Sequence, residues 1–200
     1  MFPVPSSLQR LADQIDGWLD LRCPERALDL LPPLLADPAA RAAGLCMRVR
    51  AQVRLGNHGE ALADLGELRR DHPPQDWVDL TEAWCRKRTG DLRGAIRCMQ
   101  QLLVRSPRSD IGHFNLGCYL ALSGDVDRAI DEVTLACGMN PEFRDFAREE
   151  PDLDTLRKDP RFRSLLREPT SAHDHGDGDG DGDGDGDDDD DGDESDPDRN

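Results

Sequence analysis

The side chains of this 200-residue chain that could do chemistry are six cysteines, five histidines and a run of aspartates near its C-terminal end. The cysteines show no C-x-x-C spacing and no histidine at metal-ligand spacing, so we expect reduced thiols that pack like small apolar residues. His58, His72 and His113 lie too far apart in the sequence pattern to form a cluster. No nucleophile with an orienting base and no phosphate-binding glycine loop stands out. The sequence therefore predicts no enzyme and no cofactor.

The aspartate run is the second feature that could bind a ligand. From Asp174 to Glu194 the chain is almost wholly Asp and Gly, and residues 169–200 carry most of the net charge of −17. Such a segment buries too little apolar surface to offset its ordering entropy, so we expect a disordered, solubilising tail. Alternating carboxylates also suit weak, diffuse binding of divalent cations, although no frame fits a calcium loop. A third hypothesis is that the tail folds back onto a basic surface of the chain and competes with partners.

A repeat in the remaining residues predicts the elements that must position any binding site. Three residue types recur with a spacing of 34 residues: Gly56, Gly90 and Gly124, then Ala61, Ala95 and Ala129, then Pro73, Pro107 and Pro141. A period of this length indicates helical hairpins that bury their apolar faces only against a neighbour. The glycine ends the first helix, the alanine lies where the two helices cross, and the proline closes the unit. We predict an all-α solenoid with full repeats at 42–75, 76–109 and 110–143.

The third repeat shows the pattern most clearly, with Leu116 and Gly117 followed by Leu120, Ala129 and Pro141. In these positions the chain resembles the tetratricopeptide repeat family, whose pattern combines a Leu-Gly pair with aromatic residues, two alanines and a closing proline. The resemblance covers about residues 8 to 167 and is strongest from Gly44 onward. It implies a solenoid of helix-turn-helix repeats that binds other proteins.

The first two full repeats depart from the family pattern. The first has Arg48 at a position that the pattern gives to an apolar residue, and the second has Asp79, Glu82 and Arg86 at such positions. Charged residues are costly in a core unless they are paired. We therefore expect that the first helix of the second repeat is rotated or shifted by one residue.

Residues 8–41 are interpreted as a degenerate first repeat after an N-terminal extension, residues 1–7. Apolar residues from Leu8 to Leu19 follow the spacing of an amphipathic helix, and Ala27 lies 34 residues before Ala61. Because proline costs about 3 kcal/mol inside a helix, Pro32 and Pro33 predict a short second helix followed by a new turn.

The segment 144–168 is expected to cap the array. It resembles the end-of-group segment that often closes bacterial arrays of this type. A terminal repeat needs a cap with a polar outer face, because its apolar stripe has no further repeat to cover it. The apolar residues expected to cover the stripe are Phe143, Phe146, Leu153, Leu156, Phe162, Leu165 and Leu166.

The resemblance also implies a binding site. In the tetratricopeptide repeat family the first helix of each repeat lines a concave groove that holds partner peptides. Carried over to this chain, the groove has a basic, aromatic end and an apolar end, with Arg50, Arg54, Trp77, Leu80, Trp84, Lys87, Arg88 and Phe114 as its binding residues. Such a groove fits an acidic peptide with an apolar anchor. The alternative stays open that Trp84 is a core residue and that the bases form a solvated helix face.

These observations favour a non-catalytic protein interaction module, such as an adaptor, scaffold or assembly factor. We expect a cytoplasmic protein, because no secretory signal and no apolar run of membrane-spanning length occur in the sequence. Nucleic acid is not an expected partner, since the body lacks a net basic balance and the tail would repel phosphates. Two alternatives stay open: a divalent-cation-binding acidic protein that uses the repeats as an anchor, and a secretion chaperone that masks an apolar segment of its client.

Overall fold

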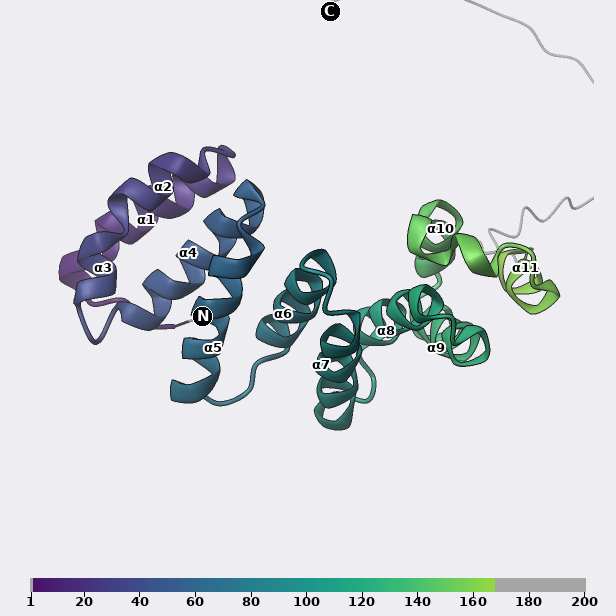
Figure 1. The fold of residues 1–200 in the computed structure, drawn as a ribbon. Helices are drawn as coiled ribbons and strands as arrows, with labels where there is room; N and C mark the ends of the chain where they lie inside the picture. Colours follow the sequence, from purple (N-terminus) through teal and green to yellow (C-terminus); the bar gives the residue numbers. More distant parts are fainter. Residues whose placement is uncertain (1, 168–200) are drawn as a thin grey trace, which may run out of the picture. The chain divides into compact units, whose positions relative to one another are not determined.

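The computed structural model describes residues 2–167 of the chain (Figure 1). The helices are α1 (Ser6–Asp20), α2 (Pro24–Leu30), α3 (Pro32–Ala36), α4 (Arg41–Leu55), α5 (His58–Asp71), α6 (Asp76–Arg88), α7 (Leu92–Arg105), α8 (Asp110–Ser123), α9 (Val126–Met139), α10 (Phe143–Glu149), the 3-10 helix η1 (Pro151–Leu156) and α11 (Pro160–Arg167). Within the described residues there is no strand, so the all-α prediction is confirmed. The predictions made for the tail, residues 169–200, concern residues outside the described range.

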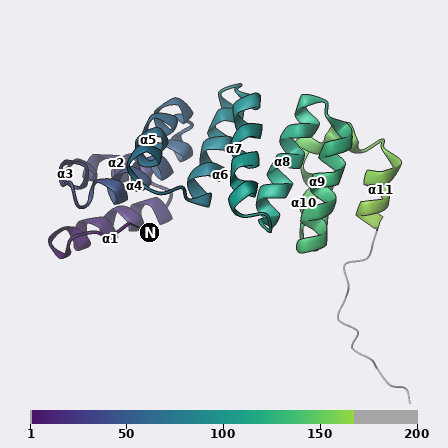
Figure 2. The same cartoon turned by 90° about the horizontal axis from the view of Figure 1, so that it is seen from below.

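The helices pack in chain order as a row of hairpins. The pairs α4 with α5, α6 with α7 and α8 with α9 form the hairpins, and contacts of α5 with α6 and of α7 with α8 join them (Figures 1 and 2). Each hairpin turns at one of the predicted glycines, which have left-handed φ angles of 79°, 86° and 85° at Gly56, Gly90 and Gly124. A side chain at these positions would be strained, whereas glycine is not. The structure is therefore the predicted α-solenoid.

Small residues let the two helices of a hairpin approach each other. The alanines at the predicted crossing points, Ala61, Ala95 and Ala129, are fully buried. In the last hairpin, a Cβ atom built on Gly117 would lie 2.6 Å from Cγ2 of Val133, closer than any real contact. The Leu-Gly pair of the third repeat therefore marks a close helix contact and not a turn.

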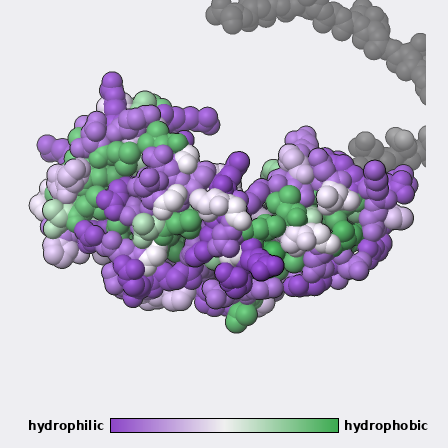
Figure 3. All heavy atoms as spheres, viewed as in Figure 1, coloured by the Kyte–Doolittle hydropathy of each residue, from purple (hydrophilic) through white to green (hydrophobic). Residues whose placement is uncertain are grey.

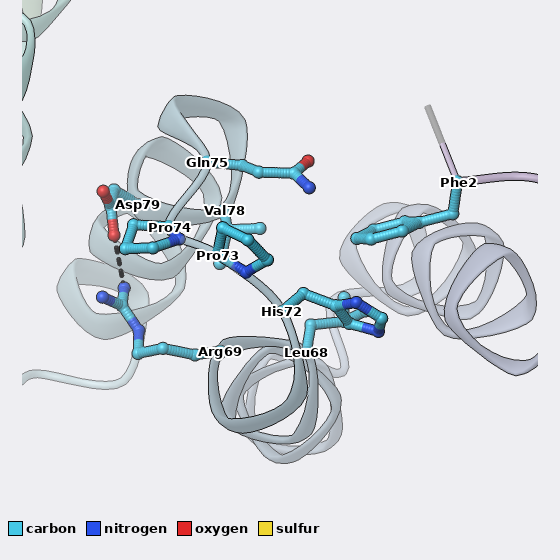
Figure 4. A pocket seen from close by; sticks show the side chains of 9 residues that line it. All are labelled: Phe2, Leu68, Arg69, His72, Pro73, Pro74, Gln75, Val78 and Asp79. Atoms are coloured by element: carbon cyan, nitrogen blue, oxygen red, sulfur yellow. Dashed lines mark hydrogen bonds and ion pairs between the residues drawn. The ribbon is translucent and has the colours of Figure 1, made fainter.

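The first helix of the second repeat keeps its inward face, so the predicted rotation or shift is wrong. Asp79 and Glu82 point into the core and are only 1% and 7% exposed. Arg69 of α5 donates hydrogen bonds to both carboxylates, and Figure 4 shows its bond to Asp79. Arg105 of α7 also donates to Asp79. Arg86 Nε donates to Glu82 at 2.9 Å. Buried carboxylates are tolerated here because neighbouring helices supply the opposite charges.

The first full repeat uses the same kind of pairing. Arg48 of α4 forms a two-point hydrogen bond to the buried carboxylate of Asp64 on α5, with Nε at 2.7 Å from Oδ2. Planar guanidinium and carboxylate groups match in this geometry. In Figure 3 the region over α6 and α7 is largely hydrophilic, between hydrophobic patches toward the two ends of the described chain. Ion pairs thus form within the first full hairpin, between Arg48 and Asp64, and across its joint with the next hairpin, between Arg69 and Asp79.

The N-terminal hairpin is irregular at the place that the prolines predict. Helix α2 ends at Leu30, and the short α3 begins at Pro32. Helix α1 packs on both α2 and α4, and α2 and α3 also pack on α4. The buried residues Ile15, Leu19 and Leu34 form the core of this part. Helix α1 therefore lies beside α4, and it forms one side of the site described next.

Candidate functional site: a groove along helix α4

Three adjoining pockets run along helix α4. The first, the apolar pocket, lies between α1, α4, α6 and the N-terminal arm, residues 2–5, and its apolar lining is Phe2, Val4, Ala12, Ala43, Met47 and Trp77. The second, the middle pocket, is lined by Val49, Arg50, Val53, Arg54, Trp77 and Thr81. The third, the basic pocket, is lined by Arg22, Pro24 and Arg54. Shared lining residues join the three into one continuous surface, which we call the α4 groove.

The N-terminal arm closes one end of the α4 groove. The Phe2 ring lies 4.5 Å from the ring of His72, measured between centroids, and points toward the turn between α5 and α6 (Figure 4). Leu68 and Val78 line the small pocket at this contact. Sequence reasoning treated residues 1–7 only as an extension, and no periodicity in so short a segment could have revealed this role.

The basic residues of the α4 groove differ in their pairing. Arg50 is paired with Asp16 and, at 3.4 Å, with Asp20, both on α1. These carboxylates neutralise its charge at the middle of the groove. Arg54 and Arg22 are exposed, and no carboxylate of residues 2–167 forms a salt bridge with either. The uncompensated positive charge of the groove thus lies at the basic pocket, near the C-terminal end of α4.

Trp77 and Trp84 lie in different surroundings. Trp77 is half-buried and lines both the apolar and the middle pocket, and its Nε1 donates to the side chain of Gln75. Trp84 instead packs edge-on against His58 of α5, with centroids 4.8 Å apart, and the guanidinium of Arg88 lies 5.1 Å from its ring centre. Trp84 and Arg88 line none of the three pockets, which agrees with the packing alternative for Trp84.

The expected apolar end of the site is filled by the chain itself. Phe114 is 6% exposed and lies against Phe143, so it belongs to the core and not to an open surface. Lys87 pairs with Asp152 of η1, and η1 packs on α8. Leu80 packs against the same core. The prediction of an open surface at Phe114 is corrected for this reason, and Lys87 and Leu80 lie outside the α4 groove.

The capping segment follows the prediction except at one aromatic residue. Five of the seven residues expected to cover the last repeat are buried: Phe143, Leu153, Leu156, Phe162 and Leu165. Phe146 is 57% exposed, which corrects its expected role. It lies one turn after Phe143 on the seven-residue helix α10, where the outer face of the helix meets solvent.

The polar side chains of the described residues do not gather into a metal-binding cluster. In residues 2–167 no group of three or more His, Cys, Asp or Glu side chains could hold a metal ion. Cys46 faces the apolar pocket, and burial raises its pKa to about 12, so it stays a neutral thiol near pH 7. His113 forms hydrogen bonds through Nδ1 to Glu132 at 2.6 Å and through Nε2 to the carbonyl of Pro107 at 3.1 Å.

No helix in residues 2–167 has the length and apolar character needed to cross a membrane.

The fold and the groove define an α-solenoid scaffold that presents a surface along one helix. The family model of the tetratricopeptide repeat matches residues 80–142. Residues 80–142 are similar to tetratricopeptide repeats by this match, and the described residues share the fold of a solved tetratricopeptide repeat protein.

Solved structures share this fold at low sequence identity. MamA 41-end from Desulfovibrio magneticus RS-1 superposes with a TM-score of 0.66 at 12% identity, over 82% of this chain and 96% of its own. The MamA RS-1 ArsTM double mutant gives 0.65 at 13% identity, over 82% and 97%. YrrB, described as a TPR protein with an unusual peptide-binding site, gives 0.62 at 15% identity, over 78% and 81%. No curated protein matches the sequence.

Proposed function

We propose that this protein binds a segment of a partner protein in the α4 groove and acts without catalysis as an adaptor, scaffold or assembly factor. The observation that carries the proposal is the continuity of three pockets along α4, which are lined by the half-buried Trp77 and the exposed Arg54. Tryptophan and arginine are the side chains that most often dominate the energy of protein interfaces. The inner face of α8, by contrast, is occupied by the capping segment.

Two further observations support the proposal. YrrB, which has the same fold, is described as having a peptide-binding site, and we extend that kind of activity to this chain as a hypothesis. The α4 groove also combines apolar walls with a few charged groups, a composition that suits recognition of a peptide.

We propose the cytoplasm as the location of the protein. Cys85, Cys98 and Cys118 are buried free thiols, which fits the reducing environment of that compartment.

Selection from a random peptide display library with the full chain as bait tests the proposed function. The selected peptides are then measured against a blocked variant, Cys46→Trp, whose indole would fill the apolar pocket. We expect the blocked variant to lose at least tenfold in affinity. Val104→Trp is the matched control, because Val104 is 85% exposed on α7 and lies outside the α4 groove.

The binding of the selected peptides to the two variants decides whether the α4 groove is the site. Loss of binding in Cys46→Trp with unchanged binding in Val104→Trp supports the α4 groove as the site. If no peptide is enriched, or if the blocked variant binds as tightly as the unchanged chain while its circular dichroism is native, the proposed function is wrong.

A further inference from the structure

The polarity of the α4 groove specifies the kind of segment that it binds. We infer that the partner segment is an extended peptide of another protein, with a carboxylate side chain about five residues from a large apolar side chain. The carboxylate lies at Arg54 and Arg22, and the apolar side chain enters the pocket beside Ala43 and Met47. This inference rests on the proposed function and adds the chemistry and spacing of the ligand.

The basic pocket supplies the site for the carboxylate. Arg22 and Arg54 reach it from different elements, the turn after α1 and the last turn of α4. Arg22 has a left-handed φ of 57° and ends α1 as Gly56 ends α4, which fixes its backbone in the turn. The negative end of the α4 dipole lies here, which disfavours a lone anion. Two guanidinium groups without a carboxylate partner in residues 2–167 outweigh that effect.

The middle pocket adds no unpaired base beyond Arg54, which it shares with the basic pocket. Arg50 pairs with two carboxylates, Asp16 and Asp20, so this group of three carries a net charge of −1 near Trp77. Such a surface accommodates a spacer of small or polar residues and does not attract a second carboxylate.

The apolar pocket supplies the site for the second anchor. It is lined by the buried residues Ala12, Ala43 and Met47 and by the half-buried rings of Phe2 and Trp77. No uncompensated charge faces it, since Asp16 is held by Arg50. Burial of one leucine or phenylalanine side chain there stabilises the complex through the hydrophobic effect.

The distance along α4 sets the spacing between the two anchors. Ala43 and Arg54 are separated by eleven positions of one helix, which at 1.5 Å per residue corresponds to about 16 Å. An extended chain advances about 3.3 Å per residue, so about five residues span the groove.

The sequence of the chain's own tail does not meet both requirements. Residues 171–200 offer many carboxylates but, apart from the small side chains of Ala172 and Pro197, no apolar side chain to enter the apolar pocket. A segment of another protein meets both, and we commit to that occupant.

The composition of the library-selected peptides tests this inference. We expect Asp or Glu to be enriched four to six residues from Leu, Ile or Phe. For a synthetic copy of the most enriched peptide, replacement of either anchor by Ser should weaken binding at least tenfold. Arg22→Glu combined with Arg54→Glu should weaken it at least tenfold as well, and the loss should shrink at high salt. The matched control is Arg93→Glu combined with Arg97→Glu, two exposed bases of α7 outside the groove.

The failures of the two proposals are distinguishable. If the selected peptides lose binding in Cys46→Trp but carry no acid-to-apolar spacing, or bind the Arg22→Glu, Arg54→Glu variant equally well, the inference is overturned and the proposed function stands. If a synthetic peptide of residues 171–200 competes with them fully, the tail is an occupant of the groove and the commitment to a partner segment is overturned.

Discussion

Phe114 of the last repeat lies against Phe143 of the capping segment, with ring centroids 4.8 Å apart and planes tilted by 34°. This contact converts the inner face of α8 from a binding surface into a core. Because η1 also packs on α8, the surface that stays open is the one along α4, which is the surface proposed for binding. In this proposal one repeat holds a partner segment and another holds the chain's own cap.

The first prediction concerns the cap. Phe143→Ala should lower the free energy of unfolding by about 3 kcal/mol, because it removes a buried aromatic side chain and leaves a cavity. Phe146→Ala, at an exposed position of the same helix, should change it by less than about 0.5 kcal/mol. Urea unfolding followed by circular dichroism measures both. Equal effects of the two substitutions would show that Phe143 does not anchor the cap.

The second prediction concerns the ionic joint. Asp79→Asn removes the charge that Arg69 and Arg105 share. We expect a loss of about 2 kcal/mol, less than for a fully buried pair because both arginine side chains are about one third exposed. Asp131→Asn, on the exposed face of α9, is the control and should be nearly neutral. A neutral result at Asp79 would mean that the pairing contributes nothing to stability.

The third prediction compares two glycines whose replacement by alanine should change the stability of the protein in opposite directions. Gly117→Ala should destabilise the protein by about 1 to 3 kcal/mol, since the new methyl group would collide with Val133. Gly66→Ala should stabilise it by about 0.5 to 1 kcal/mol, because no atom lies within 4 Å of a Cβ there and alanine favours the helix. Thermal unfolding compares the two variants. Destabilisation by both would contradict the close approach of α8 and α9 as the specific cause.

The fourth prediction concerns pH. The backbone N–H of Gly94 donates to Asp91, and with the Arg86 guanidinium it lowers the pKa of that carboxyl group. A lowered pKa in the folded state means that the stabilisation is complete above the ordinary pKa of about 4 and is lost as the pH falls through the folded value. Between pH 5 and 2.5 the unchanged protein should therefore lose stability more steeply than Asp91→Asn, which keeps the acceptor but does not titrate. If the stability of both proteins falls equally between these pH values, Asp91 does not contribute to the pH dependence.

The sequence predicted the repeat register because its causes are local. Left-handed glycines, crossing alanines and closing prolines are each required by one backbone position in every unit, so their recurrence every 34 residues, as at Gly90 and Ala95, could be interpreted from the sequence alone. The orientation of α6 could not be predicted in this way. Asp79 is buried only because Arg69 and Arg105 reach it from two other helices, and a pattern within one helix does not contain that information.

The site was predictable in part. Arg50, Arg54 and Trp77 line the α4 groove, whereas Trp84, Lys87 and Arg88 have partners of their own and Phe114 is covered by the cap. A family pattern indicates which helix face points inward, but it does not show that a later segment returns to cover that face. Phe2 was missed for the same reason, since its role depends on a contact with His72.

The most direct test of the central claim is hydrogen exchange of the full chain with and without a saturating selected peptide. The account predicts slower exchange in α4 (Arg41–Leu55) and α1 (Ser6–Asp20), with little change in α8 (Asp110–Ser123) and α9 (Val126–Met139). Protection centred on α8 and α9, with α4 unchanged, would contradict it.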